Sequence, residues 1–291
     1  MEYEYKITNQ ESFELADIFE CGQCFRWNIQ DDESYTGVVK NSVINVSKKD
    51  NEIIFKGSFE GSKEEFENLI RYYFDLDTNY TDFKEKLANI DEYLNTAIKF
   101  GSGIRILNQD LWECIISFII SANNNIPRIK KIIERISERY GKEIKFQGKS
   151  YYTFPNVESL SKASVEDLRA LGTGFRDVRI FNTTHMILEK KVDLNKIKEM
   201  KSSDEMREEL LKLDGVGPKV ADCILLFSTL KRLDVFPIDV WVRRVMNELY
   251  IHNENEEKVS KKEILNLADK KFLKISGLAQ QYLFYWKRSA S

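Results

Sequence analysis

Hydrophobic and polar residues alternate over most of the first sixty residues, which is the period expected of β-strands. Short polar turns at 31–32, 40–41 and 50–51 separate the later segments from one another. The strand-like segments are YEYKIT, CFRWNIQ, SYTGVVK, SVINVSKK and NEIIFKGS. They predict an antiparallel sheet with one covered face, followed by a helix from Lys63 to Phe74 whose apolar residues recur at helical spacing.

From about residue 101 the apolar positions recur every three or four residues, which is typical of helices. The predicted helices are Asp110–Ala122, Pro127–Tyr140, Ser164–Leu171, Asp177–Lys191, Glu205–Leu213, Lys219–Phe227, Asp239–Tyr250, Lys261–Phe272 and Gly277–Arg288. The pattern therefore predicts an α+β fold. A small N-terminal antiparallel sheet domain with flanking helices (1–100) lies beside an all-helical body (101–291).

The most informative stretch is a glycine turn between two of these helices. Gly215, Val216 and Gly217 reverse the chain, because glycine tolerates positive φ, and Pro218 suits the first position of the next helix. Residues 205–228 are thus predicted to form a helix-hairpin-helix motif. Its glycine amides and the N-terminus of its second helix can hold a phosphate without reading a base.

Lys219 and Asp239 lie on this unit, twenty residues apart, and together suggest cleavage of a sugar–base bond. That cleavage builds positive charge on the sugar, which a carboxylate stabilises. A neutral amine can trap C1′ as a Schiff base, which later permits strand cleavage by β-elimination. The helix start and a partly buried pocket are both expected to lower the pKa of Lys219. Alternatively, Lys219 is only a phosphate contact and Asp239 only the N-cap of the next helix.

The net charge of −3 does not favour a nucleic-acid partner, but the charge is unevenly distributed. Residues 1–98 hold 10 Lys and Arg against 21 Asp and Glu, whereas residues 99–191 hold 16 against 10 and residues 192–291 hold 18 against 16. Counterion release depends on local charge, so the basic surplus around the candidate motifs is compatible with DNA binding.

Cysteine usage and hydropathy bound the cellular setting. The four cysteines are scattered, there is no apolar run of transmembrane length, and no signal peptide precedes the acidic start MEYEYK. Cys21 and Cys24 form a CxxC pair, but no second pair completes a zinc or iron–sulfur set, so neither a catalytic metal nor a cofactor is expected. The sequence predicts a cytoplasmic, nucleoid-associated protein, and its Ile-, Lys- and Asn-rich composition points to a prokaryote.

GVGPKVADC followed by PIDV resembles the helix-hairpin-helix and Gly/Pro–Asp signature of the DNA glycosylase superfamily, and more narrowly the 8-oxoguanine DNA glycosylase family. Four further motifs are similar to that family in the same order: GQCFRW (22–27), ECIISFIISANNNIPRI (113–129), LRALGTGFR (168–176) and GLAQQYLF (277–284). The resemblance implies a TATA-binding-protein-like sheet domain and base flipping into a pocket at its junction with the helical body. It also implies a base-excision-repair glycosylase with associated lyase activity, with Lys219 as the nucleophile and Asp239 as the transition-state carboxylate.

The resemblance assigns four residues to the base pocket. The Gly22 carbonyl would accept the N7–H of 8-oxoguanine, where guanine offers only a lone pair. Cys223 and Phe284 would sandwich the flipped base, and Gln280 would read its Watson–Crick edge. Taken alone, Gly22 is a turn residue, Cys223 and Phe284 are core residues, and Gln280 is a helix-surface residue.

The resemblance assigns other residues to the DNA around the lesion. Asn123 would fill the gap left by the flipped base, while Arg128 and Arg176 would contact the unpaired cytosine, which predicts a preference for lesions opposite cytosine. Two positions depart from the family. Phe175 replaces the usual tyrosine wedge, and Trp241 replaces a histidine, so that its indole N–H can contact a phosphate but cannot titrate.

The hairpin is also a candidate ion site. Through the carbonyls of Leu211, Leu213 and Val216 it can hold a monovalent or divalent ion that bridges to phosphate without a catalytic role. The expected partner is damaged double-stranded DNA, with no membrane, and the protein is expected to be a monomer. Two alternatives stay open: a glycosylase of the same superfamily for other oxidised or alkylated bases, and a non-enzymatic DNA-binding protein that uses the hairpin only for grip.

Overall fold

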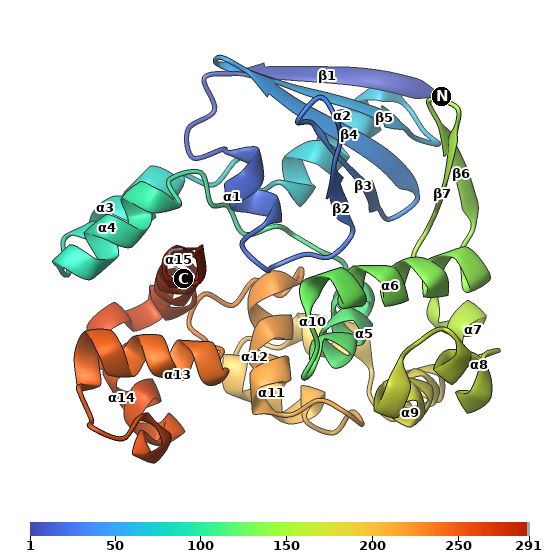
Figure 1. Cartoon of the computed structure of the whole chain (residues 1–291). Helices are drawn as coiled ribbons and strands as arrows, with labels where there is room; N and C mark the ends of the chain where they lie inside the picture. Colours follow the sequence, from blue (N-terminus) through green and yellow to red (C-terminus); the bar gives the residue numbers. More distant parts are fainter. Residues whose placement is uncertain (290–291) are drawn as a thin grey trace.

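The computed structural model describes residues 1–289 as a twisted sheet above a helical body (Figure 1). All five predicted strands are present, in the antiparallel order β1-β5-β4-β3-β2. Their bounds are β1 (Glu2–Thr8), β2 (Trp27–Ile29), β3 (Tyr35–Val39), β4 (Ser42–Lys49) and β5 (Glu52–Ser58). The predicted α+β class is confirmed.

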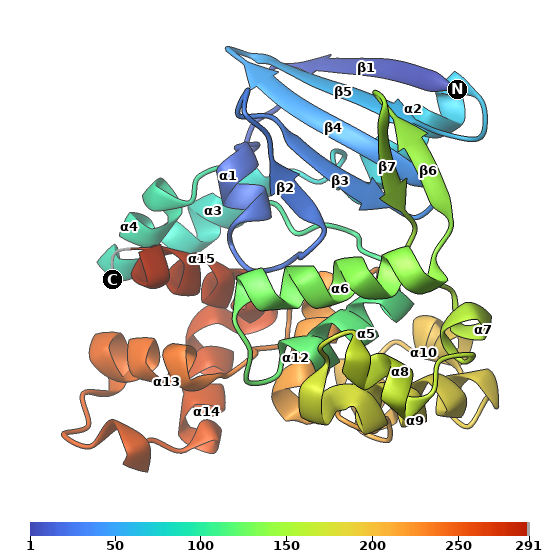
Figure 2. The ribbon, with the colours of Figure 1, turned by 45° about the vertical axis from the view of Figure 1, so that its right-hand side comes forward.

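The sheet is covered on both faces at β3 and β4, not on one face as predicted. One face packs on α1 (Leu15–Phe19) and α2 (Lys63–Tyr73). On the other face Val38 and Val43 pack with Phe146. Phe146 belongs to a hairpin of β6 (Glu143–Phe146) and β7 (Lys149–Tyr152) that rises from the helical body against the sheet (Figure 2). The sequence prediction of an all-helical body missed this hairpin.

Two helices before residue 100 were also missed. Helix α3 (Tyr80–Ala88) packs on α4 (Glu92–Phe100), and α4 lies beside the C-terminal helix α15 (Ser276–Ser289), as Figures 1 and 2 both show. Their apolar residues belong to the core of the helical body rather than to that of the sheet. The division into two domains at residue 100 stays a prediction.

The helical body contains every helix that the sequence predicted, and additional short ones. Its elements are α5 (Leu111–Ser121), α6 (Ile126–Tyr140), α7 (Val157–Leu160), α8 (Val165–Ala170), η1 (Gly174–Arg176), α9 (Asp177–Leu188), α10 (Leu194–Glu199), α11 (Ser203–Leu210), α12 (Pro218–Phe227), α13 (Val240–Met246), a π-helix η2 (Asn247–Ile251), η3 (Glu256–Lys258), α14 (Lys261–Phe272) and η4 (Leu273–Ile275). Polar caps begin many of them; Asn125, for example, caps α6 through the amide of Arg128 at 3.0 Å.

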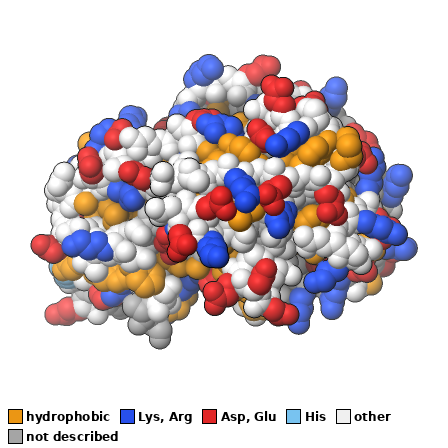
Figure 3. All heavy atoms as spheres, turned by 90° about the horizontal axis from the view of Figure 1, so that it is seen from above, with side chains coloured by type: hydrophobic (Ala, Val, Ile, Leu, Met, Phe, Trp, Pro, Cys, Tyr) orange, Lys and Arg blue, Asp and Glu red, His pale blue; other side chains and the backbone are white. Residues whose placement is uncertain are grey.

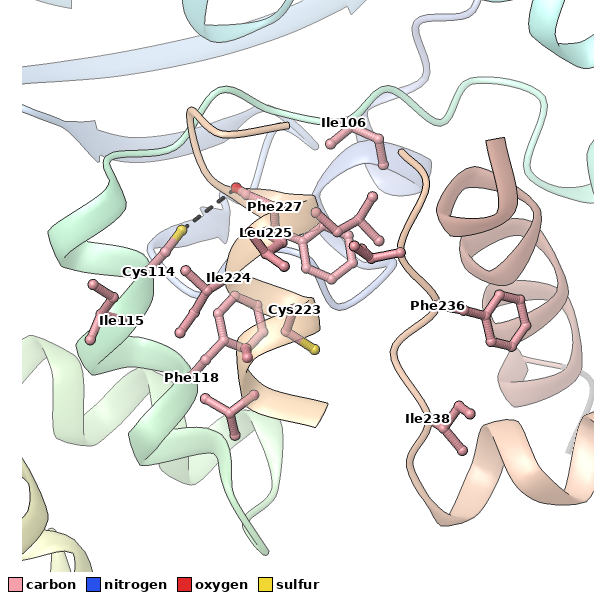
Figure 4. Packing of buried hydrophobic residues seen from close by; sticks show 14 of the residues in the cluster. Ile106, Cys114, Ile115, Phe118, Cys223, Ile224, Leu225, Phe227, Phe236 and Ile238 are labelled. Carbon is pink, nitrogen blue, oxygen red and sulfur yellow. Dashed lines mark hydrogen bonds between the residues drawn. The ribbon is translucent and has the colours of Figure 1, made fainter. Parts of the chain in front are cut away.

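The centre of the body is the packing of α5 against α12. Figure 4 shows Phe118 of α5 beside Cys223 and Ile224 of α12, and the Cys114 thiol donating to the carbonyl of Phe227. Helix α5 is buried almost all round, as its apolar sequence predicts. This rigid pair of helices supports one wall of the site described below.

The surface above the sheet carries no broad patch of one sign. Figure 3 shows acidic and basic side chains interspersed with short apolar strips on this side of the molecule. No helix within residues 1–289 is both long and apolar enough to cross a membrane.

Candidate active site

The glycine turn joins α11 to α12 as predicted. Gly215 has φ +84°, in the region that favours glycine, whereas Gly217 has φ −91° and caps α12, with Pro218 in its first turn. A Cβ added to Gly217 would meet nothing within 4 Å. This end of the hairpin is therefore open, and the free amides at the start of α12 face that opening.

Lys219 and Cys223 are one helical turn apart on α12, so their side chains lie on the same face of the helix. The Cys223 sulfur is the largest influence on the pKa of the lysine. The Lys219 ammonium also lies 5.8 Å from the ring centroid of Phe118 on α5. The lysine is thus held at the wall that α5 and α12 build, half-buried and beside a buried thiol.

The predicted direction of the Lys219 pKa is wrong. The Cys223 sulfur, followed by the Asp239 carboxylate, stabilises the ammonium more than burial opposes it, and together they raise the pKa of Lys219. Burial raises the pKa of the Cys223 thiol, so the sulfur carries its proton at neutral pH. The free protein therefore keeps Lys219 protonated near neutral pH.

Asp239 begins α13, as predicted. Its Oδ1 accepts a hydrogen bond from the amide of Val242 at 2.8 Å, which makes it the N-cap. Oδ2 accepts no hydrogen bond from any residue in the described part of the chain. One oxygen of the carboxylate therefore stabilises the helix while the other is available to a ligand.

Lys219 and Asp239 line the same cavity, of about 390 Å³. It opens between the loop before β2 and the helices α5, α12, α13 and α15, a volume that suits a small ligand or a nucleobase. The predicted site residues that line it are Gly22, Lys219, Cys223, Asp239, Trp241, Gln280 and Phe284. The cavity thus brings together both candidate catalytic residues and all four candidate base-pocket residues.

The base-pocket candidates differ in backbone conformation, in exposure and in hydrogen bonding. Gly22 has φ +89°, so glycine is required there. Gln280 is 5% exposed, and its Oε1 is buried without a hydrogen-bond partner among the described residues. A buried amide oxygen left unpaired is costly, and a ligand donor in the cavity would satisfy it. Phe284 is partly exposed and carries the Arg288 guanidinium 5.2 Å from its ring centroid.

The remaining predicted residues lie outside the cavity. Arg176 is 2% exposed, and its guanidinium donates to the carbonyls of Ala122, Asn123 and Thr173. Its neighbour Phe175 is 58% exposed and lies over that guanidinium. The structure thus places Phe175, Arg176 and the exposed Asn123 together, beside the start of α6.

Arg128 lies in a separate shallow groove near that cluster. Its guanidinium is exposed and reaches the Gly172 carbonyl at 3.4 Å. Lys131 and Arg135, one and two turns further along α6, line the same groove. Three neighbouring cations without a carboxylate within 4 Å in the described structure make this a positive surface.

Of the twenty residues that line the cavity, thirteen were not predicted as site residues; Phe118, Gln281 and Arg288 are among them. Phe118 lies under Lys219, and Gln281 and Arg288 belong to the same helix as Gln280 and Phe284. For Arg288 a signal existed, because it follows Phe284 by one helical turn. No three His, Cys, Asp or Glu side chains within residues 1–289 come together as a metal site.

Two family models match the chain over almost its whole length. The 8-oxoguanine DNA glycosylase N-terminal domain matches residues 6–115, and the HhH-GPD superfamily base excision DNA repair protein model matches residues 116–270. The chain is therefore an HhH-GPD base-excision repair protein. It belongs to the 8-oxoguanine DNA glycosylase family, which confirms the predicted family and the predicted enzyme class, a DNA N-glycosylase with lyase activity.

Named relatives and solved structures agree with this assignment. A probable N-glycosylase/DNA lyase of Methanothermobacter thermautotrophicus is 35% identical, over 74% of this chain and 72% of its own length. The N-glycosylase/DNA lyase of Saccharomyces cerevisiae is 32% identical, over 85% and 71%. The 8-oxoguanine glycosylase/lyase of Clostridium acetobutylicum, solved with double-stranded DNA containing cytosine opposite 8-oxoG, is 42% identical, covers 100% of this chain and 98% of its own, and has a TM-score of 0.91.

Proposed function

We propose that the protein removes 8-oxoguanine from duplex DNA, preferentially opposite cytosine, with Lys219 as the nucleophile and Asp239 as the stabilising carboxylate. The observation that carries this proposal is that both side chains line one cavity with the candidate base-pocket residues. The Clostridium acetobutylicum structure, whose bound duplex holds cytosine opposite 8-oxoG, supports the same substrate.

In the proposed chemistry Lys219 attacks the sugar as the base leaves. As the C1′–N9 bond breaks, Asp239 stabilises positive charge on the sugar and the base leaves with a proton. The neutral Lys219 nitrogen bonds to C1′ and gives up one proton to the leaving base. The C1′–O4′ bond then breaks, O4′ takes a proton from water, and a protonated Schiff base remains. Removal of a C2′ proton then expels the 3′ phosphate and cuts the strand. Because Lys219 is an ammonium in the free protein, its proton must leave before attack.

This protonation state gives a pH prediction. The single-turnover rate of base release should rise with pH from about 6 upwards, by about tenfold per unit while the ammonium predominates. Cys223→Ala removes the largest influence that raises the Lys219 pKa, so the profile should move to lower pH. Cys114→Ala, which removes another buried thiol of the same helix pair, should leave the profile in place. A Cys223→Ala profile that stays or moves to higher pH would contradict this account.

The base pocket would distinguish the lesion by its hydrogen-bond pattern. The Gly22 carbonyl would accept the N7–H that 8-oxoguanine has and guanine lacks. Gln280 would pair with the Watson–Crick edge, which would satisfy its buried oxygen. Cys223 and Phe284 would enclose the base from either side, at the cost of extruding it from the duplex.

The DNA strands would be held by the residues around the cavity. The open amides beside Gly215 and Gly217 would bind a phosphate of the lesion strand, with the Trp241 indole N–H near a second phosphate. On the other strand, Phe175 would wedge and Asn123 would fill the gap. Arg176 and Arg128 would contact the unpaired cytosine.

The proposed substrate is tested by excision from duplexes that carry 8-oxoguanine opposite each of the four bases. Fast release opposite cytosine, with borohydride trapping of a covalent enzyme–DNA adduct, is the expected result. Release of an oxidised pyrimidine or alkylated purine instead would favour the other glycosylase reading. A gel shift with no base release would favour a non-enzymatic DNA-binding protein.

Arg128→Ala should reduce the preference for cytosine over adenine opposite the lesion by about tenfold, because one specific side-chain contact to a base discriminates by about 1–3 kcal/mol. The ratio of single-turnover rates on the two duplexes measures this effect. Lys131→Ala, in the same groove, provides the matched control. It should weaken binding to both duplexes equally. Equal ratios for wild type and Arg128→Ala would exclude Arg128 as the reader of the opposite base.

Three further proposals concern the assembly as a whole. The carbonyls of Leu211, Leu213 and Val216 would hold a structural ion at the hairpin. The protein would act as a monomer in the cytoplasm of a prokaryotic cell. Residues 1–100 and 101–291 would form its two domains.

A further inference from the structure

Two side chains of α15 hold the loop that leads into Gly22. The Nε2 of Gln281 donates to the Cys21 carbonyl at 2.6 Å, and Gln281 is 1% exposed. One residue before the end of the described helix, the Arg288 guanidinium donates to the Glu20 carbonyl. Another nitrogen of Arg288 would lie 3.2 Å from a Cβ placed on Gly22. The C-terminal helix thus fixes the two peptide carbonyls just before Gly22.

The loop after Gly22 is fixed as firmly. The Nε2 of Gln109 donates to the Gln23 carbonyl at 2.7 Å. The Gln23 side chain is fully buried, donates to the carbonyls of Ile18 and Arg105 at 2.8 Å each, and accepts from the amide of Leu107 at 2.9 Å. The peptide before Gly22 and the peptide after Gln23 are therefore both held by side chains.

The Gly22 carbonyl is the exception in this loop. The carbonyls of residues 20, 21 and 23 each accept a hydrogen bond from a side chain, whereas that of Gly22 accepts none from any residue of the described chain. Gly22 lines the cavity. Buried carbonyls are normally paired, so the one unpaired acceptor of this loop, at the edge of the cavity, is available to a ligand donor.

We propose that Gln281 is a positioning residue for lesion discrimination, and that it acts through the Gly22 carbonyl. This inference rests on the proposed function. Glycine at position 22 permits rotation about its own backbone bonds, so only the held neighbours fix where its carbonyl points. When the Cys21 carbonyl loses its donor, the Gly22 carbonyl loses its direction, and the contrast between an N7–H and an N7 lone pair weakens.

Gln281→Leu keeps a similar volume and removes the donor. Two single-turnover rates are measured on each protein: release of 8-oxoguanine opposite cytosine, and cleavage of a preformed abasic site. The second reaction uses Lys219 but no base. We expect the ratio of the first rate to the second to fall at least tenfold. An undamaged duplex should also compete for binding more strongly with the variant than with the wild-type protein.

Tyr282→Phe is the matched control on the same helix. The Tyr282 hydroxyl is buried without a hydrogen-bond partner in the described structure, so its removal should leave the ratio as in wild type. Arg288→Met tests the same loop from a half-exposed position, and decides the question if Gln281→Leu fails to fold. Its ratio should also fall.

A merely structural role for Gln281 would lower both rates together and leave their ratio unchanged. That result in a folded Gln281→Leu protein, or in Arg288→Met where Gln281→Leu does not fold, would overturn the proposal. Failure of the proposed function is a separate result, because wild-type protein would then release no 8-oxoguanine at all.

Discussion

Lys219→Gln is expected to abolish covalent trapping on 8-oxoguanine DNA and to lower base release by about four orders of magnitude. Glutamine is shorter than lysine by one atom but is still a flexible polar side chain, and its amide nitrogen is not a nucleophile. Borohydride trapping and single-turnover excision on one duplex measure the two effects together. DNA affinity should fall only slightly, because one cation is lost.

Lys212→Gln is the control for this loss of charge. Lys212 lies in the same motif, just after the end of α11, and pairs there with Glu209. It should trap and excise as wild type does. A trapped adduct that persists in Lys219→Gln would show that another residue is the nucleophile. The assignment of the cavity as the active site would then be wrong.

Cleavage of a preformed abasic site should be lost in the same variant. The lyase step also needs an amine to form the Schiff base, so both reactions depend on one nitrogen. This shared dependence separates Lys219 from Gln281, whose substitution is expected to affect the two reactions unequally.

The sequence predicted the strands and the long helices because their apolar periods are strong. The same periodicity did not predict elements that are short, or elements whose apolar spacing runs into that of a neighbouring element. The hairpin of β6 and β7 has only four residues in each strand, although its turn at Gln147 and Gly148, both with positive φ, is a usable signal. Helices α3 and α4 directly follow Asn79 and Asp91, whose side chains cap them.

The motifs were a better guide to the residues that line the cavity than to the pKa of Lys219. The resemblance named every base-pocket candidate that lines the cavity. The direction of the Lys219 pKa was predicted from burial and the helix end alone, although Cys223 follows at the spacing that places both side chains on one face. The roles of Gln281 and Arg288 could not be predicted, because their partners lie more than 250 residues away in sequence and meet them only after folding.

Asp239→Asn is the substitution that best separates the two readings of this residue. Asparagine caps a helix about as well as aspartate does, so the free energy of unfolding should change by no more than about 0.5 kcal/mol. The negative charge beside the developing positive charge on the sugar is lost, and base release should fall by about 10²- to 10³-fold. Affinity for DNA should stay equal or increase, since a negative charge has been removed from the interface.

Asp239→Ala completes the comparison, because alanine removes the cap as well as the charge. It should lose about 1 kcal/mol of stability in addition to the same loss of rate. Denaturant unfolding and single-turnover excision, both measured on both variants, therefore separate the effect on stability from the effect on rate. If Asp239 were only the N-cap of α13, Asp239→Asn would excise as wild type does, and Asp239→Ala would differ from it in stability alone. A slow but stable Asp239→Asn protein is the outcome that places the carboxylate in the reaction.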